Sequence, residues 1–256
     1  MTSRFGPGLL VSTEGGVATV AISNPARRNA MTLGMWLALP RVLAGLAADP
    51  GVRVLVLTGE GEAFSAGADI GELTDAEGRQ AVQEAALAAE EALAAFPKPT
   101  VAAVRGFCVG GGCQLAVACD LRFAARGARF GVTPARLGIV YAASSTRRLV
   151  AVAGPATAKY LLFSAELIDD ERALRTGLVD EVLPDADHLD ARVRAFAATL
   201  TTRSRLTQTA AKEFAAGPPT PERAAYWAHQ AATTPDTDEG ATAFLTGRTP
   251  TFTWTP

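Results

Sequence analysis

The residues whose types and spacing most directly suggest chemistry are three consecutive glycines, Gly110 to Gly112. They follow an apolar stretch typical of a strand and precede a short apolar stretch typical of a helix. Glycine lets a ligand approach the main chain. A helix that begins after such a turn points free N–H groups and the positive end of its dipole at that ligand. The arrangement suits an oxygen that becomes negative during a reaction, and a purely structural tight turn is the alternative interpretation.

The composition does not favour a metal-binding protein, a nucleic-acid-binding protein or a membrane protein. The formal net charge is -2, which gives no attraction to nucleic acid or to an anionic membrane. No stretch has the length of a membrane span, and the N-terminal residues lack the apolar core of a signal peptide. Cys108, Cys113 and Cys119 lie in apolar surroundings, so we expect buried free thiols in a reducing cytoplasm. His188 and His229 have no partners at metal-ligand spacing, so no metal site is predicted.

Strand and helix patterns alternate up to about residue 144 and then give way to helices. Extended apolar segments are expected over 9–13, 17–22, 52–58, 101–104, 121–125 and 129–131, with helices over 33–48 and 79–96. A nearly continuous apolar strand such as 52–58 is typical of a parallel sheet, so the pattern predicts an α/β fold of repeated β-β-α units. Later helices are expected over 155–163, 186–200, 204–215, 221–231 and 237–245. Their small-residue faces fit packing either against another subunit or onto the chain's own core.

Two separated stretches, AFSAGADIGEL over 63–73 and KPTVAAVRGFCVGGGCQLAVACDLRFAA over 98–125, resemble the crotonase, or enoyl-CoA hydratase/isomerase, superfamily. The resemblance continues through 130–138, 144–149, 171–184 and 244–252. It implies a crotonase-like β-β-α spiral core over 1–200 and a C-terminal helical trimerisation region over 201–256. It also implies an acyl-CoA substrate, no cofactor beyond the coenzyme A of that substrate, and a homotrimer or a hexamer.

The resemblance also implies roles for individual residues. Two backbone N–H groups of the family hold the thioester oxygen as it becomes an enolate, and they fall on Ala66 and Gly111. The residues implied in binding the substrate and its coenzyme A are Arg27, Arg28, Ala68, Asp69, Ile70, Gly110, Pro134 and Arg248. Gly247 departs from the lysine that usually precedes the last of these arginines. The alternative interpretation of Arg27 and Arg28 is that they are two solvated loop residues without a ligand.

The two glutamates that carry out hydration in this superfamily are both replaced here. Gln114 follows the GGGC tetrad where hydratases have one glutamate, and Pro134 takes the position of the second. Neither side chain exchanges a proton near neutral pH. The stretch TPARLGIVY, residues 133–141, resembles the methylmalonyl-CoA decarboxylase branch instead. Loss of CO2 needs no base, and Tyr141 and Thr133 could hold the departing carboxylate as neutral donors, so the sequence predicts decarboxylation of a malonyl-type thioester.

Two other functions stay open at this stage. One is an enoyl-CoA hydratase or isomerase whose acid comes from elsewhere, with Glu72 and Asp75 the nearest candidates in the sequence. The other is a catalytically silent acyl-CoA-binding protein. Tyr141 also fits an ordinary pocket wall, and Thr133 fits a helix N-cap.

Overall fold

The computed structural model describes residues 2–4 and 8–255. Its strands are β1 (Thr2–Arg4), β2 (Leu9–Glu14), β3 (Val17–Ile22), β4 (Val54–Gly59), β5 (Thr100–Val104), β6 (Phe107–Val109), β7 (Leu121–Ala125), β8 (Arg129–Gly131), β9 (Ile168–Asp169) and β10 (Glu181–Leu183). Its α-helices are α1 (Leu33–Ala48), α2 (Ala76–Ala94), α3 (Gly111–Ala118), α4 (Ala143–Ser164), α5 (Asp170–Arg175), α6 (Ala186–Thr201), α7 (Arg205–Ala216), α8 (Pro221–Thr233) and α9 (Asp236–Thr246). Single 3₁₀ turns lie at η1 (Pro25–Arg27), η2 (Ile70–Glu72) and η3 (Pro134–Arg136).

A largely parallel sheet forms the centre of the molecule. Its strand order is β1-β2-β3-β4-β5-β7-β10, and from β3 onward each neighbouring pair runs in parallel. β1, β2 and β3 pair in antiparallel fashion at one edge, while β6, β8 and β9 form a second, smaller sheet. Every residue of β5 is buried, as expected for a strand covered on both faces. The predicted α/β fold is confirmed.

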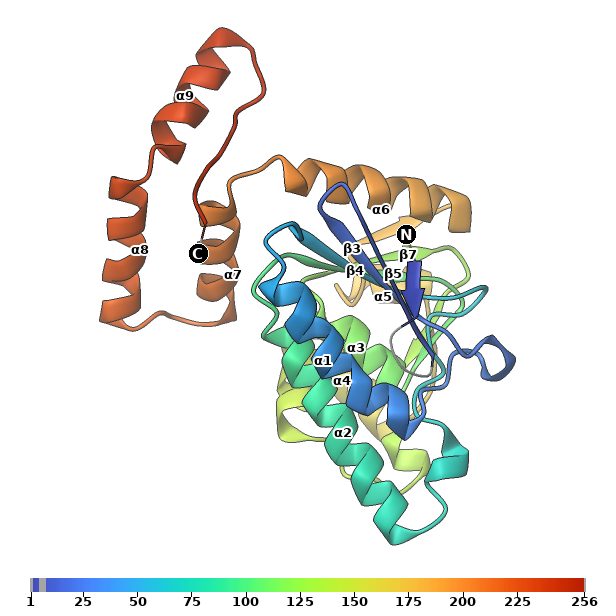
Figure 1. The fold of residues 1–256 in the computed structure, drawn as a ribbon. Coiled ribbons are helices and arrows are strands. Elements are labelled where there is room, and N and C mark those ends of the chain that lie inside the picture. Colours follow the sequence, from blue (N-terminus) through green and yellow to red (C-terminus); the bar gives the residue numbers. More distant parts are fainter. Residues whose placement is uncertain (1, 5–7, 256) are drawn as a thin grey trace.

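Helices cover both faces of the large sheet. Figure 1 shows α1 to α4 on one face and α6 lying across the other. The larger core cluster joins α1, α2 and α3 to the sheet, with Trp36, Phe64 and Phe96 among its largest fully buried side chains. A smaller cluster packs α6 against β4, β5 and β7. The pocket described below opens on the side of the larger cluster.

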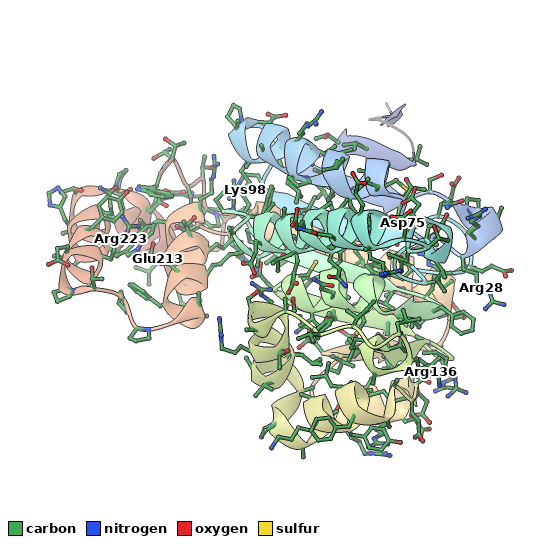
Figure 2. The ribbon with its side chains drawn as sticks, turned by 90° about the horizontal axis from the view of Figure 1, so that it is seen from below. Arg28, Asp75, Lys98, Arg136, Glu213 and Arg223 are labelled. Carbon is green, nitrogen blue, oxygen red and sulfur yellow. The ribbon has the colours of Figure 1, made fainter. Side chains whose placement is uncertain are left out.

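Local capping explains where the helices of the larger cluster begin. The Thr32 hydroxyl accepts a hydrogen bond from the Met35 N–H at 3.3 Å, so α1 begins where the sequence predicted. The Asp75 carboxylate, labelled in Figure 2, accepts one from the Gly78 N–H at 2.7 Å, so α2 begins three residues earlier than expected. The helix predicted to open at Pro155 is confirmed, because the backbone at Gly154 is not helical (φ 76°, ψ 160°) and divides α4 into two helical stretches. The first of these stretches, which begins at Ala143, was not predicted.

The last three helices form a group of their own. Figure 1 shows α7, α8 and α9 to one side of the sheet and its covering helices. Leu206, Trp227 and Trp254 make a small cluster separate from the two clusters on the sheet, so these helices do not complete the chain's main core. Arg223 and Glu213, which Figure 2 shows together within this group, are joined at 2.6 Å. In the part of the chain that the structure describes, no helix is long and apolar enough to cross a membrane.

Candidate active site

A pocket of about 370 Å³ opens beside the N-terminus of α3. Its walls come from α2, from the segments around η2 and η3, and from the first residues of α3. Most lining side chains are apolar. The predicted site residues that line it are Ala66, Ala68, Ile70, Gly110, Gly111, Gln114, Thr133, Pro134 and Tyr141. The fold therefore gathers residues from three separate stretches of sequence around one cavity.

Close backbone approach creates the polar end of this pocket. Gly67 has φ of 97°, and a β-carbon there would lie 2.8 Å from the Val109 carbonyl oxygen and 3.1 Å from the Gly111 nitrogen. Only glycine fits such a position. The loop before η2 is thus held against the start of α3. Among the described residues, neither the Gly111 N–H nor the Ala68 N–H donates to a protein acceptor. A β-carbon built on Gly111 would lie 3.7 Å from the Ala68 nitrogen, so the two donors are neighbours.

The prediction that the Ala66 N–H is one of the two donors is wrong. That N–H already donates to the Arg28 carbonyl oxygen at 2.9 Å. Ala66 still lines the pocket, but its donor is occupied by the protein. Two residues later, the Ala68 N–H has no acceptor among the described residues and lies at the pocket. Ala68 was expected only to bind coenzyme A, and hydrogen bonding across the loop decides between the two alanines.

Gln114 lines the pocket one helical turn beyond Gly111. Its side-chain nitrogen donates to the carboxylate of Glu90, a residue of α2 that is 1% exposed. The same carboxylate accepts hydrogen bonds from the Ser145 hydroxyl and from the Arg148 guanidinium. Glu90 had no predicted role in the function, and Ser145, a candidate pocket hydroxyl or helix cap from the sequence, contacts Glu90 instead of lining the pocket. Nothing in the sequence pairs Glu90 with Gln114, because they lie on different helices.

Tyr141 and Thr133 bring hydroxyl groups to the pocket wall. Burial raises the pKa of the Tyr141 hydroxyl well above its usual value, so this group stays protonated and can donate. Among the described residues, the Tyr141 hydroxyl has no hydrogen-bond partner in the protein. Thr133 occupies the N-cap position of η3, yet its side chain makes no capping hydrogen bond. Both hydroxyls are therefore available to a ligand.

The predicted cations do not reach the pocket. Arg27 forms an ion pair with Asp69 at 2.5 Å, and the Arg28 guanidinium lies 4.7 Å from the centre of the Phe107 ring. Figure 2 shows Arg28 at the surface. Arg248 pairs with Glu239 at 2.6 Å within the α7–α9 group. That pair and a backbone hydrogen bond lower the pKa of Glu239 to about 2. Asp69 also caps η2 by accepting from the Gly71 N–H at 3.0 Å.

The acids proposed from sequence proximity have structural roles. Glu72 accepts a hydrogen bond from the Leu33 N–H at the start of α1, and Asp75 caps α2. Neither lines the pocket. Glu84 of α2 is instead the single carboxylate among the described residues that line it. Sequence reasoning missed Glu84, because a glutamate on an exposed helix face looks like a solvated residue.

Comparison with known proteins agrees with this architecture. Residues 12–254 match the model of the family described as "Enoyl-CoA hydratase/isomerase". The chain belongs to the enoyl-CoA hydratase/isomerase family. It is 33% identical to a 2,3-dehydroadipyl-CoA hydratase of Escherichia coli, over 95% of this chain and 98% of that protein. It is 35% identical to a crotonyl-CoA hydratase of Syntrophomonas wolfei, over 72% of this chain and 75% of that protein.

Solved structures of the same family share the fold. A structure titled enoyl-CoA hydratase/carnithine racemase, from Magnetospirillum magneticum, superimposes with a TM-score of 0.91 at 34% identity, covering 98% of this chain and 97% of that one. A putative enoyl-CoA hydratase/isomerase family protein from Hyphomonas neptunium gives a TM-score of 0.90 at 35% identity, covering 97% and 98%. The resemblance to the crotonase superfamily is therefore confirmed, together with its fold.

Proposed function

We propose that this enoyl-CoA hydratase/isomerase family member is a lyase that acts on acyl-CoA thioesters and hydrates an enoyl-CoA. The observation that carries the proposal is the pair of unpaired N–H groups, on Ala68 and Gly111, at one end of an apolar pocket. Two fixed donors beside a developing oxyanion stabilise the transition state by several kcal/mol, roughly 3 kcal/mol for one such donor. The names of the relatives support hydration better than the decarboxylation predicted from the sequence.

The proposed reaction uses the thioester as an electron sink. The oxygen of a water molecule bonds to the β-carbon, and the electron pair of the C=C bond moves toward the thioester. The resulting enolate oxygen accepts hydrogen bonds from the Ala68 and Gly111 N–H groups. The water gives up one proton to a base, and the α-carbon takes a proton to complete the addition. Apolar walls strengthen the two hydrogen bonds, because little water competes for them.

Glu84 supports the proton transfers in this proposal. Hydration needs a group that exchanges protons near neutral pH, and Glu84 is the single carboxylate among the described lining residues. It accepts one hydrogen bond, from the Gln80 amide at 2.8 Å, so it keeps acceptor capacity for water. Gln114 and Pro134 supply no such group.

The test measures hydration of crotonyl-CoA by the loss of the enoyl absorbance. We expect Glu84→Gln to lower kcat/KM about 100-fold, since general acid–base catalysis contributes at least that much. Glu77→Gln is the matched control, because Glu77 is an exposed glutamate of the same helix and does not line the pocket. Equal rates for the two variants would contradict the role of Glu84.

Decarboxylation of methylmalonyl-CoA or a related thioester is the second candidate. It is favoured by the uncharged Gln114 and Pro134 and by the protonated Tyr141 hydroxyl. The C–C bond to the carboxylate would break, CO2 would leave, and the electron pair of that bond would form the same enolate without a base. The α-carbon would then take a proton from water. Mass spectrometry separates the candidates, because this route gives propionyl-CoA and is unaffected by Glu84→Gln. Tight binding of both thioesters without turnover would indicate a silent acyl-CoA-binding protein.

A further inference from the structure

A buried carboxylate lies behind the pocket wall and has no part in the proposed reaction. Glu90 is 1% exposed and does not line the pocket. It is surrounded by donors, namely the Gln114 amide nitrogen, the Ser145 hydroxyl and the Arg148 guanidinium. An ionised carboxylate only accepts hydrogen bonds. Glu90 therefore dictates which end of each neighbouring polar side chain turns toward it.

The Gln114 amide has only one way to fit this network. Its nitrogen carries two hydrogens, and both are used, one by the Glu90 carboxylate and one by the Ser145 hydroxyl oxygen at 3.3 Å. The reversed amide would place its oxygen against a carboxylate, which leaves two acceptors in contact and no donor between them. The amide orientation is thus assigned by the network. Its carbonyl oxygen is left to face the pocket that Gln114 lines.

The position of Gln114 along α3 relates this oxygen to the bound acyl group. Gly111 and Gln114 are three residues apart, so they share one face of the helix. The rise between them is about 4.5 Å at 1.5 Å per residue. Gly111 and Gln114 both line the pocket, so an acyl chain whose thioester oxygen is bound to the Gly111 N–H would pass the Gln114 side chain. A substituent on the β-carbon is the part of such a chain that the Gln114 oxygen would contact.

We propose that Glu90 is a positioning residue that locks the Gln114 amide, so that the pocket presents an acceptor to the acyl chain and selects acyl groups with a donor at the β-carbon. A 3-hydroxyacyl thioester has such a donor, whereas a 3-oxoacyl thioester has only an acceptor there. This inference rests on the proposed thioester site. It also accounts for a glutamine at position 114, because a second carboxylate beside Glu90 would be repelled.

The experiment compares the affinities of 3-hydroxybutyryl-CoA and 3-oxobutyryl-CoA by calorimetry. We expect the wild-type protein to bind the hydroxy form at least 5-fold more tightly, the effect of about one hydrogen bond. In Glu90→Gln the amide of Gln114 is free to turn and donate, so the preference falls below 2-fold. Ser145→Ala removes the second acceptor of the Gln114 amide without removing a buried charge. We expect it to lower the same preference, so the proposal can be tested even if Glu90→Gln folds poorly.

Glu91→Gln is the matched control. Glu91 neighbours Glu90 and pairs with the same Arg148 at 3.0 Å, but the Gln114 amide donates to Glu90 and Ser145 and not to Glu91. This variant keeps the wild-type preference. The proposal is overturned if Glu90→Gln and Ser145→Ala keep the preference, if Glu91→Gln loses it, or if the wild-type protein shows none. Calorimetry measures binding and requires no turnover. If the protein keeps its preference for the hydroxy form but does not hydrate crotonyl-CoA, only the proposed reaction is rejected. Failure to bind either thioester rejects both proposals.

Discussion

At the scale of single residues, the site depends on which backbone donors the protein leaves unused. Ala66 and Ala68 have the same side chain and both line the pocket. The Ala66 N–H is paired with the Arg28 carbonyl oxygen, and the Ala68 N–H has no acceptor among the described residues. A buried donor without a partner is costly, so a free N–H at a pocket wall marks a place for a ligand oxygen. The distinction between these alanines is testable.

We predict opposite results for proline at the two positions, because proline has no N–H. Ala68→Pro removes a donor that no protein group uses, so thioester turnover falls about 100-fold or more while the midpoint of thermal unfolding changes little. Ala66→Pro breaks the hydrogen bond to Arg28 and lowers the free energy of unfolding by roughly 1 kcal/mol or more. Turnover assays and thermal unfolding of both variants check this. A fully active, stable Ala68→Pro protein would remove Ala68 from the site.

At the scale of elements, α3 is the short helix on which the site depends. Its first residue offers the Gly111 N–H, and its second, Gly112, packs where a β-carbon would lie 2.5 Å from the Ser65 carbonyl oxygen. Its remaining residues, Cys113 to Ala118, are buried. The predicted free, buried thiols at 108, 113 and 119 are confirmed. Burial raises the pKa of the Cys119 thiol, at the end of this helix, from 9.0 to about 12.

The raised pKa of Cys119 predicts a loss of stability at alkaline pH. Between pH 9.0 and about 12 the unfolded chain releases this proton while the folded chain keeps it. The free energy of unfolding therefore falls as pH rises through this window, by up to about 1.4 kcal/mol per pH unit for one thiol. Urea unfolding at pH 8, 9 and 10 should show a shallower decline for Cys119→Ala than for the wild-type protein. Parallel declines would contradict the assignment, whatever the offset at pH 8.

At the scale of the whole molecule, the α7–α9 group is the part whose purpose a single chain does not explain. It forms its own small cluster, and Phe244 and Leu245 of α9 are 85% and 84% exposed. Adjacent exposed apolar side chains on an ordered helix are typical of a surface that binds another protein. This agrees with the trimer or hexamer expected from the family resemblance, which stays a prediction.

We predict that the protein in solution has a mass that is three or six times that of the 26.5 kDa chain. Replacing Phe244 and Leu245 together by glutamate should shift it toward the monomer, because both charges would be desolvated in a subunit interface. Light scattering after gel filtration measures the mass. Replacing exposed Thr242 and Thr246 of the same helix by serine is the control. A monomeric wild-type protein would contradict the prediction.

The sequence by itself determined the fold class, the glycine turn, the family and the two replaced glutamates. These features depend on residue types at short spacing: continuous apolar strands, three glycines before a helix, and Gln114 directly after the tetrad. The ends of α1 and of β7 were predictable for the same reason, since capping and apolar patterning are local. The helix that opens at Pro155 was also predictable, because proline is favoured in the first turn of a helix. The helical stretch of α4 before Gly154 was not predicted.

Only the tertiary structure decided which groups are available for chemistry. Glu90 meets Gln114 across 24 residues and Ser145 across 55, and no local pattern encodes such contacts. The same holds for Glu72, which is used at the start of α1, and for Glu84, which is brought to the pocket by the placement of α2. The type of a residue determines which hydrogen bonds it can donate or accept. Its contacts within the protein determine which of these remain available to a substrate. That is why Glu84 at the pocket and the unused N–H of Ala68 emerged only once the chain was folded.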